Sequence, residues 1–408
     1  MNIALIGGGG IAETAFSQCT DHNVIAIADV DEQRGAPAFK EYPEAKQYKD
    51  FRRLLDRHYK ELDLAIISTP DHTHFAATYG AMERGISVHT QKPLTHNLWE
   101  ARTLQSAAHR FKVHTVMGNQ GHTMEGMRYI REWYEAGLLG TVREVHAWTN
   151  RTTTNSANAR MPLPLAQPVP GTLDWDLWLG PRSERAYNEA YCPGRWRWWW
   201  DFGLGGLGDI GCHALDIPVY ALQLGYPSKV SMSSLDFSHE VGAKSPKEEA
   251  ATYVYEFPET ADRPGVTVYW YEGGRLPRFP EDLRDSETGE ISYAPEGGCL
   301  LMGTGNSIYS LGMRPTSPRL VKDWDELRRQ LPAKAIPRAI GGPIREVIGS
   351  ICGEIKEPGS NFDYAAPLTE IVILGTIANR AQKVVEYNPV DMTFRDLSLN
   401  VYVKESVR

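Results

Sequence analysis

Short apolar runs alternate with stretches of mixed polarity in the first part of the chain. The stretches at residues 76–84 and 98–110 have a helical pattern, and Gly85 ends the first of them. The apolar runs between them predict buried strands at residues 3–6, 24–28, 62–70, 86–90 and 113–118. Strands that alternate with helices predict a parallel sheet with right-handed crossovers.

The pattern changes after Gly118, where strand-like runs follow one another with few helices between them. This succession predicts an open, mostly antiparallel sheet. Its strands are expected at residues 142–149, 229–235, 250–257, 265–271 and 298–310. Helices are expected at residues 124–136, 323–330, 343–354 and 366–383, the last starting near Pro367. The chain is therefore predicted to be α/β, with domains at residues 1–121 and 122–408 and the helix at 366–383 packed back against the first domain.

A glycine-rich turn follows the first apolar run. Gly7, Gly9 and Ala12 have the spacing of the G-x-G-x-x-A dinucleotide fingerprint of a Rossmann domain. Gly7 would allow the tight turn, and Gly9 would remove a side chain that blocks a pyrophosphate. Gly10 and Ile11 complete the turn, and the free N–H groups of the following helix would bind the phosphates. The alternative is a Rossmann-type unit that binds nothing.

Asp29 ends the second apolar run, where the fingerprint expects an acid that binds the ribose 2′-hydroxyl. A carboxylate accepts hydrogen bonds from this hydroxyl and repels a 2′-phosphate, so NAD is favoured over NADP. Asp31 adds a second negative charge nearby. Arg34 leaves NADP open, because an arginine can accommodate the phosphate.

Composition restricts the function classes. The 408 residues are 42% hydrophobic and 23% charged, which is ordinary for a globular protein of two domains. The net charge of −8 gives no reason to expect nucleic acid. We see no secretory signal and no apolar run near the ~20 residues of a membrane span. The five cysteines form no CxxC pair, so a reducing cytoplasm is expected.

Two further clusters follow predicted strands of the first domain. Thr69, Pro70 and His74 follow the third strand, and Gln91 and Lys92 follow the fourth. Both clusters would therefore lie at the carboxyl edge of the sheet, where ligands of such sheets bind. A lysine beside a nicotinamide could polarise a substrate hydroxyl or carbonyl. The alternatives are a proline-containing turn for the first cluster and a surface loop for the second.

Asp209 and His213 are spaced four residues apart and share one face if their segment is helical. A histidine and a carboxylate on one face suit proton transfer in alcohol oxidation. They could instead be a structural pair at a helix start. A metal site would need a third ligand, for which Cys192 or another histidine is available; our expectation is no metal.

Taken in order, these motifs resemble those of the glucose–fructose oxidoreductase, inositol dehydrogenase and rhizopine catabolism (Gfo/Idh/MocA) family. The family's usual Glu-Lys-Pro is Gln91-Lys92-Pro93 here, which removes a negative charge but keeps the lysine. The resemblance implies that Lys92, Asp209 and His213 form the catalytic group. His213 would be the acid/base, and Lys92 and Asp209 would orient the substrate and tune the charge.

Other segments resemble a branch of that family whose members often handle sugars or glycosides. In this branch Asn119 would lie near the nicotinamide. His122 and Arg151 follow strand ends and could contact the substrate. The tryptophan-rich runs at residues 173–181 and 196–203 are interpreted as mostly structural, with Trp199 a candidate to reach the substrate.

The leading hypothesis is NAD(P)-dependent oxidation of a secondary hydroxyl of a sugar, glycoside or cyclitol. A second hypothesis is redox-assisted glycoside cleavage with a recycled cofactor. A third is an NAD-binding sensor without catalysis. The resemblance implies that the second sheet carries a subunit interface, and an exposed sheet face needs covering. We therefore expect a homodimer or homotetramer with a small-molecule substrate.

Overall fold

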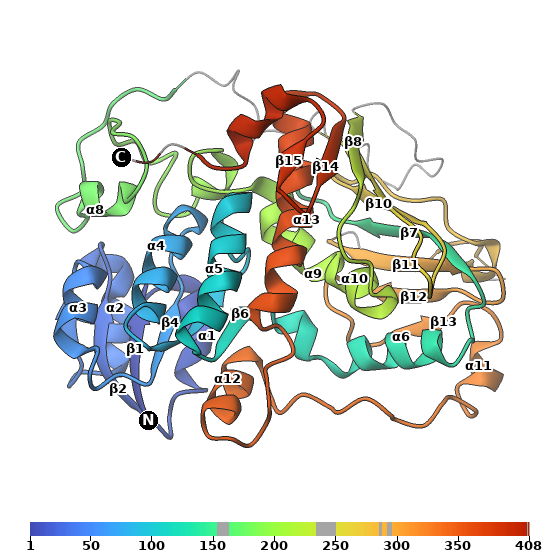
Figure 1. The fold of residues 1–408 in the computed structure, drawn as a ribbon, viewed down its shortest axis with the longest axis horizontal. Helices are drawn as coiled ribbons and strands as arrows, with labels where there is room; N and C mark the ends of the chain where they lie inside the picture. The colour runs from blue at the N-terminus through green and yellow to red at the C-terminus, as the bar shows by residue number, and fades with distance from the viewer. Residues whose placement is uncertain (153–162, 234–249, 285–287, 292–295, 406, 408) are drawn as a thin grey trace.

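Two β-sheets organise the protein, one in each half of the chain (Figure 1). The computed structural model describes residues 1–152, 163–233, 250–284, 288–291, 296–405 and 407. The first sheet has the order β3-β2-β1-β4-β5-β6, and all its neighbouring strands are parallel. The strands are β1 (Asn2–Ile6), β2 (Asn23–Ala28), β3 (Lys46–Tyr48), β4 (Leu64–Ile67), β5 (Ser87–Gln91) and β6 (Thr115–Gly118). The expected Rossmann-like sheet is confirmed.

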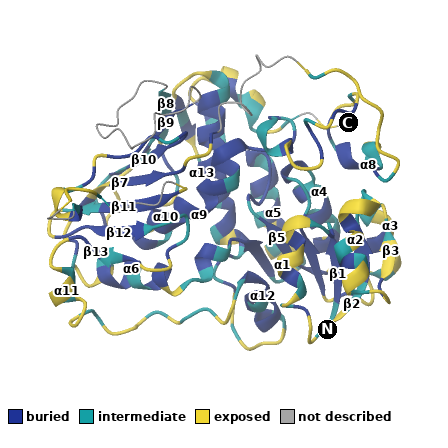
Figure 2. Ribbon diagram, turned by 180° about the vertical axis from the view of Figure 1, so that it is seen from behind, coloured by how far each residue is buried: buried dark blue, intermediate teal, exposed yellow. Residues whose placement is uncertain are grey.

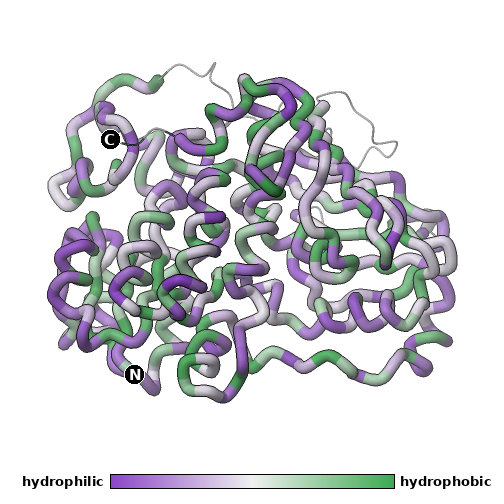
Figure 3. Tube along the Cα trace, viewed as in Figure 1, coloured by the Kyte–Doolittle hydropathy of each residue, from purple (hydrophilic) through white to green (hydrophobic). Residues whose placement is uncertain are grey.

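The helices of the first domain connect these parallel strands. They are α1 (Glu13–Phe16), α2 (Glu32–Glu41), α3 (Phe51–His58), α4 (Asp71–Met82) and α5 (Leu98–Phe111). The hydrophobic pattern did not predict β3, α2 or α3, and the outer helices α2 and α3 carry many hydrophilic residues (Figure 3). Both helices begin at an aspartate cap: Asp31 accepts the N–H of Gln33, and Asp50 that of Arg52.

The second sheet is open and mixed, with the order β13-β12-β11-β7-β10-β9-β8-β14-β15. Its strands are β7 (Val142–Trp148), β8 (Lys229–Ser233), β9 (Thr252–Phe257), β10 (Val266–Tyr271), β11 (Gly298–Gly303), β12 (Ile308–Leu311), β13 (Arg319–Leu320), β14 (Val385–Asn388) and β15 (Thr393–Phe394). Only the β7–β10 pair is parallel among these described strands. The mostly antiparallel sheet is thus confirmed. The strand expected at 298–310 is a hairpin of two strands, and residues 234–235 lie outside the described residues.

Helix α13 (Phe362–Ala381) lies between the two sheets (Figure 1) and is buried over most of its length (Figure 2). It packs on α5 and β6 of the first half and on β8 of the second. The helix begins before the predicted residue 366, because the Asn361 side chain accepts the N–H groups of Asp363 and Tyr364. None of the described helices is long and apolar enough to cross a membrane.

The remaining helices of the described residues lie in the second half of the chain. They are α6 (Glu125–Glu135), α8 (Trp175–Leu179), α9 (Cys212–Ala214), α10 (Asp216–Leu222), α11 (Trp324–Leu327) and α12 (Pro343–Ile351). Helix α12 packs against β5 and β6. Its Ile344 and Val347 share a buried apolar cluster with Ile3 and Leu5 of β1. The core of the first sheet is therefore completed by residues from the far end of the chain.

Gly375 brings α13 close to the second sheet, and we expect Gly375→Ala to destabilise the protein. An added Cβ would collide with the Tyr255 hydroxyl and lie 2.8 Å from Leu207 Cδ1. Alanine normally stabilises a helix interior by about 1 kcal/mol relative to glycine, whereas overpacking a core costs about 1–3 kcal/mol. Urea unfolding should show a net loss. Tyr255→Phe should restore part of it in the double variant; an unchanged or higher stability of Gly375→Ala would contradict this packing.

Candidate active site

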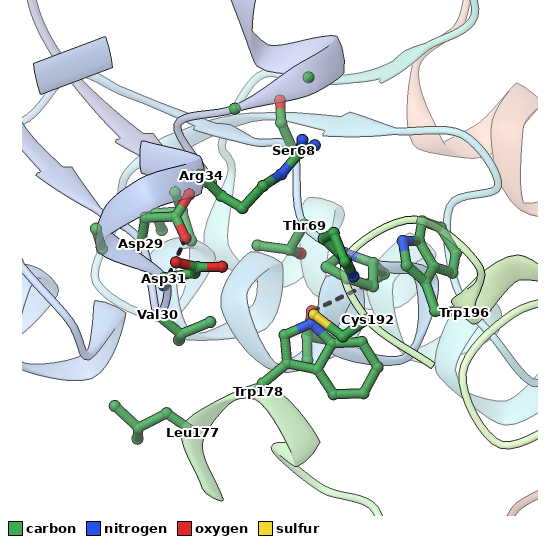
Figure 4. A pocket seen from close by; sticks show the side chains of 18 of the residues that line it. Asp29, Val30, Asp31, Arg34, Ser68, Thr69, Leu177, Trp178, Cys192 and Trp196 are labelled. Carbon is green, nitrogen blue, oxygen red and sulfur yellow. Dashed lines mark hydrogen bonds between the residues drawn. The ribbon is translucent and has the colours of Figure 1, made fainter. Parts of the chain in front are cut away.

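A cavity of about 320 Å³ lies at the carboxyl ends of β1, β2 and β4 (Figure 4). This is the edge at which open α/β sheets bind ligands. The cavity is lined by seven of the residues expected to bind the cofactor, namely Gly7, Gly9, Gly10, Ile11, Asp29, Thr69 and Pro70. The structure therefore brings together the glycine turn, the end of the second strand and the Thr69-Pro70 loop.

Steric contacts explain why Gly7 and Gly9 are glycines. Gly7 has a φ of +90°, and a Cβ there would lie 2.7 Å from the Ser68 carbonyl oxygen. A Cβ on Gly9 would collide with the carbonyl of Arg34 in α2. Gly9 thus also lets α2 approach the turn, a reason that the sequence alone did not provide. The turn can therefore lie close to both α2 and the Ser68 loop while it lines the cavity, where its backbone fits the pyrophosphate of a dinucleotide.

The carboxylate of Asp29 is fixed at the edge of this cavity (Figure 4). Its Oδ2 accepts the N–H of Gly8 at 2.8 Å, and its Oδ1 accepts the N–H of Asp31 at 2.9 Å. Burial raises the pKa of Asp29, although these two N–H groups act in the opposite direction. Arg34 lines the same cavity. Lys49 also lines it, so Asp29 faces the cavity together with two nearby cations, and its role as a ribose ligand stays a prediction.

A segment of the second half covers this cavity. Trp178, Cys192 and Trp196 face the same space as the side chains of the first domain (Figure 4). Backbone hydrogen bonds hold the segment in place: Glu32 donates to Thr172, and Asp174 donates to Val30. The tryptophan-rich sequence drew attention to this segment but did not predict that it covers the cavity. We call residues 172–197 the roof.

His72 joins the roof to the first turn of α4. Its Nε2 lies 2.8 Å from the carbonyl oxygen of Trp178. Burial lowers the pKa of His72 to about 3. The ring is therefore neutral near pH 7, and its Nε2–H donates to this carbonyl, which can only accept.

Trp199 packs within the aromatic cluster under the roof. Its indole N–H donates to the carbonyl of Ala190 at 2.8 Å, and its ring lies edge-on to Tyr191 with centroids 4.8 Å apart. These contacts agree with a mostly structural role of the tryptophans. A contact between Trp199 and a substrate stays a prediction.

Lys92 and Asp209 form an ion pair between the two halves of the chain. Lys92 follows β5, and its Nζ donates to the Asp209 carbonyl oxygen at 2.5 Å and to Oδ1 at 3.0 Å. Arg197 lies 3.3 Å from the same Oδ1, and Arg151 contacts Oδ2. Burial would raise the pKa of Asp209, but the charges of Lys92, Arg197 and Arg151 outweigh it and hold this pKa well below its usual range.

Two arginines in this cluster differ in how well the sequence predicted them. Arg151 was expected to contact a substrate, and here it contacts Asp209. Arg197 was not predicted, since an arginine between tryptophans gives no local sign of function. It lines the cofactor cavity and also contacts Asp209. The ion cluster therefore adjoins the cavity.

His213 follows Asp209 in one continuous helical segment, which is the condition under which the sequence would place them on one face. Asp209 lies in a π-helical turn (Leu207–Gly211) that continues into α9. His213 is 2% exposed, and its Nδ1 lies 2.8 Å from Asn119 Oδ1. Burial, followed by the charges of Lys92 and Arg314, lowers the pKa of His213 well below its ordinary value. Asp209 acts in the opposite direction, so the sequence could not decide this competition.

The other predicted site residues lie near the same edge of the first sheet, at or just after the ends of its strands. His74 links two of these loops, because its ring nitrogens lie 2.8 Å from the carbonyl oxygens of Thr69 and Pro93. Gln91 is buried at the end of β5. Asn119 and His122 follow β6 and are both fully buried. Among the described residues, no group of three or more His, Cys, Asp or Glu side chains could hold a metal ion.

Comparison with known families agrees with this arrangement. Residues 1–119 match the family model described as "Oxidoreductase family, NAD-binding Rossmann fold", and residues 130–248 match the C-terminal alpha/beta domain of the same family. The chain belongs to the Gfo/Idh/MocA family. The resemblance inferred from the motifs is confirmed, and the protein is an oxidoreductase with an NAD-binding domain.

Two characterised relatives are distant. The rhizopine catabolism protein MocA of Rhizobium meliloti is 25% identical over 160 residues, which are 38% of this chain and 50% of MocA. The chain thus matches half the length of that relative. The D-glucoside 3-dehydrogenase of Escherichia coli K12 is 23% identical over 306 residues, 72% of this chain and 74% of the relative.

Solved structures share the fold. The WlbA dehydrogenase of Chromobacterium violaceum, in complex with NADH and UDP-GlcNAcA, has a TM-score of 0.65 at 16% identity, covering 95% of this chain and 96% of its own. A levoglucosan dehydrogenase, in complex with NADH and L-sorbose, has a TM-score of 0.59 at 16% identity, covering 95% and 98%.

We expect this family member to bind NAD more tightly than NADP. The carboxylate of Asp29 would accept a hydrogen bond from the ribose 2′-hydroxyl and repel a 2′-phosphate. Asp29→Ala should therefore reduce the difference between the NAD and NADP dissociation constants. Dissociation constants of both cofactors, measured by calorimetry for wild type and variant, test this. Arg34→Ala is the matched change on the same cavity and should not improve NADP binding. Tighter NADP binding by the wild type would refute the assignment.

Proposed function

We propose that this protein oxidises a secondary hydroxyl of a sugar, glycoside or cyclitol with NAD as the acceptor. One observation carries the proposal: Lys92 of the first half meets Asp209 of the second beside the cofactor cavity, and His213 follows in the same helical segment. The names of the glucoside 3-dehydrogenase and levoglucosan dehydrogenase relatives support a carbohydrate substrate.

The side chains divide the work of such an oxidation. Bound NAD supplies the acceptor for the hydride that leaves the substrate carbon. Neutral His213 takes the hydroxyl proton, so a C–H and an O–H bond are replaced by a carbonyl. The Lys92 ammonium stabilises the developing negative charge on the oxygen. Asp209 holds Lys92 in place, and its own charge is compensated by Arg151 and Arg197.

The purified protein incubated with NAD and a panel of sugars, glycosides and cyclitols tests this function. Accumulating NADH with a ketone product supports the proposal. Cleavage of a glycoside without net NADH would replace it with the redox-assisted hydrolase. Tight NAD binding without turnover of any compound would favour the sensor.

Lys92→Met should abolish most turnover while NAD stays bound. A lysine that acts on the reacting hydroxyl contributes mainly in the transition state, and acid–base groups typically contribute about 10²–10⁴-fold. We expect kcat to decrease by a factor within this range and the NAD dissociation constant to change little. Lys229→Met, which removes a lysine paired with Glu256 on the second sheet, is the control. A near-normal kcat would remove Lys92 from the mechanism.

The pH profile should lack an acid limb near pH 6.5. Because the pKa of His213 is well below its ordinary value of 6.5, the ring stays neutral and able to accept a proton below that pH. We therefore expect kcat/KM for oxidation to stay level through pH 6.5 and to fall only at lower pH. His213→Gln should lose most activity. A rise of kcat/KM centred at or above pH 6.5 would contradict this state of His213.

The homo-oligomer expected from the sequence stays a prediction, as do the individual roles of the site residues.

A further inference from the structure

A chain of three buried polar side chains leads from His213 through Asn119 to Asp216. Asn119 and Asp216 are fully buried, and His213 is 2% exposed. Asn119 Oδ1 lies 2.8 Å from His213 Nδ1, and Asn119 Nδ2 lies 3.0 Å from Asp216 Oδ2. Asn119 follows β6 of the first domain, whereas the other two residues lie on α9 and α10. The predicted function gave Asp216 no role.

The surroundings of Asn119 fix which way its amide points. Its Nδ2 donates to the carbonyl oxygen of Cys212 at 2.7 Å and to Asp216. Both partners can only accept, so a flipped amide would place its oxygen against two other oxygens. Both Nδ2 hydrogens are used by these bonds. Asn119 Oδ1 therefore faces His213.

This orientation decides the tautomer of His213. An amide oxygen can only accept, so His213 Nδ1 must carry a hydrogen and donate it to Asn119. A neutral imidazole has one N–H, which leaves the lone pair on Nε2. We propose that Asn119 and Asp216 are positioning residues that hold His213 in its Nδ1–H tautomer, with Nε2 as the proton acceptor. The catalytic part of this inference rests on the function proposed above.

Asp216 is itself held by donors from other elements. The Tyr364 hydroxyl of α13 donates to Oδ1, and His122 Nδ1 lies 3.1 Å from both carboxylate oxygens. His122 Nε2 is buried and has no hydrogen-bond partner among the described residues, whereas Nδ1 faces two acceptor oxygens, so the ring donates to the carboxylate through Nδ1–H. Asn119, His122 and Tyr364 thus satisfy the carboxylate from three sides.

The three linked side chains His213, Asn119 and Asp216 also affect the imidazolium form of His213, the form that would exist after proton transfer. Lys92, Arg151 and Arg314 oppose a charge on this ring, and Asp209 favours it. Asp216 adds a second negative charge, transmitted through the polarised amide of Asn119. Around Asp216 the other charged groups are Arg128 of α6, which donates to the His122 carbonyl, and Glu346 of α12. Tyr220 of α10 packs on the His122 ring.

Nitrogen NMR of the protein labelled with ¹⁵N-histidine measures the tautomer directly, without NAD or substrate. His213→Gln identifies the signals of His213. We expect a protonated Nδ1 and an unprotonated Nε2 in the wild type at neutral pH. Asn119→Leu, which keeps the volume but removes the acceptor, should give a mixture of tautomers. A wild-type Nε2–H form, or an unchanged tautomer in Asn119→Leu, would overturn the proposal.

Kinetics separate positioning from general stability. Asp216→Asn should lower kcat by about 10-fold, less than the ~10²–10⁴-fold that an acid–base group itself contributes, and leave NAD affinity unchanged. Its acid limb should move to lower pH, because a negative charge that favours the imidazolium is lost. Glu370→Gln is the matched control: a fully buried carboxylate of α13, bound by Arg102 and Tyr387 instead. It should cost stability without moving the acid limb.

Equal kinetic losses in the two variants would reduce Asp216 to a structural role. The two proposals also fail differently. If no substrate is oxidised but His213 has the Nδ1–H tautomer, the proposed function fails and the positioning of the ring stands. If oxidation occurs with an Nε2–H tautomer, the positioning proposal fails alone.

Discussion

The ion pair between Lys92 and Asp209 is the contact on which the arrangement of the site depends. It joins the end of a Rossmann strand to a helical segment of the other half, and both side chains are largely buried. A buried carboxylate is stable only when its oxygens are well satisfied, and here two arginines complete the set. Lys92 and Asp209 can therefore keep their relative position only while the two halves of the chain keep theirs.

Two features hold the two halves of the chain in this relative position. Helix α13 packs on elements of both sheets, and the roof is hydrogen-bonded to the first domain over the cofactor cavity.

The charges around His213 are brought together by this packing. Cations from both halves surround His213 and favour its neutral state, whereas Asp209 beside it and Asp216 behind Asn119 supply the negative charge that an imidazolium needs. The proposed oxidation requires a base of this kind, neutral at first and able to carry a charge after it takes the proton.

The sequence predicted the parts of this fold whose signals are local. The apolar runs, the glycine turn and Asp29 lie within one strand and its turn, so spacing alone revealed them. The polar helices α2 and α3 were missed because their caps, Asp31 and Asp50, are weak signals without an apolar run. The predicted start of α13 is wrong because Pro367 is typical of a first helical turn, whereas the capping Asn361 begins the helix earlier.

The site residues also divide into those that have a local sequence signal and those that lack one. Lys92, Asp209 and His213 were predicted from motifs, and the structure places Lys92 against Asp209 and His213 in the same helical segment. Arg197, Asp216 and Tyr364 were not predicted, because their partners lie far away along the chain. The state of His213 depends on burial and on several charges from different elements, a balance that no local pattern contains.

Residues from the far end of the chain complete the core of the first sheet, and this affects how the chain folds during synthesis. Ile344 and Val347 of α12 fill the apolar cluster around Ile3 and Leu5, and α13 covers the same domain. Domains generally fold as units during synthesis, the N-terminal one first. Here the first sheet cannot close its core until the ribosome has released the end of α13. The apolar positions that α12 and α13 cover in the folded protein therefore stay uncovered while the whole intervening sheet is translated.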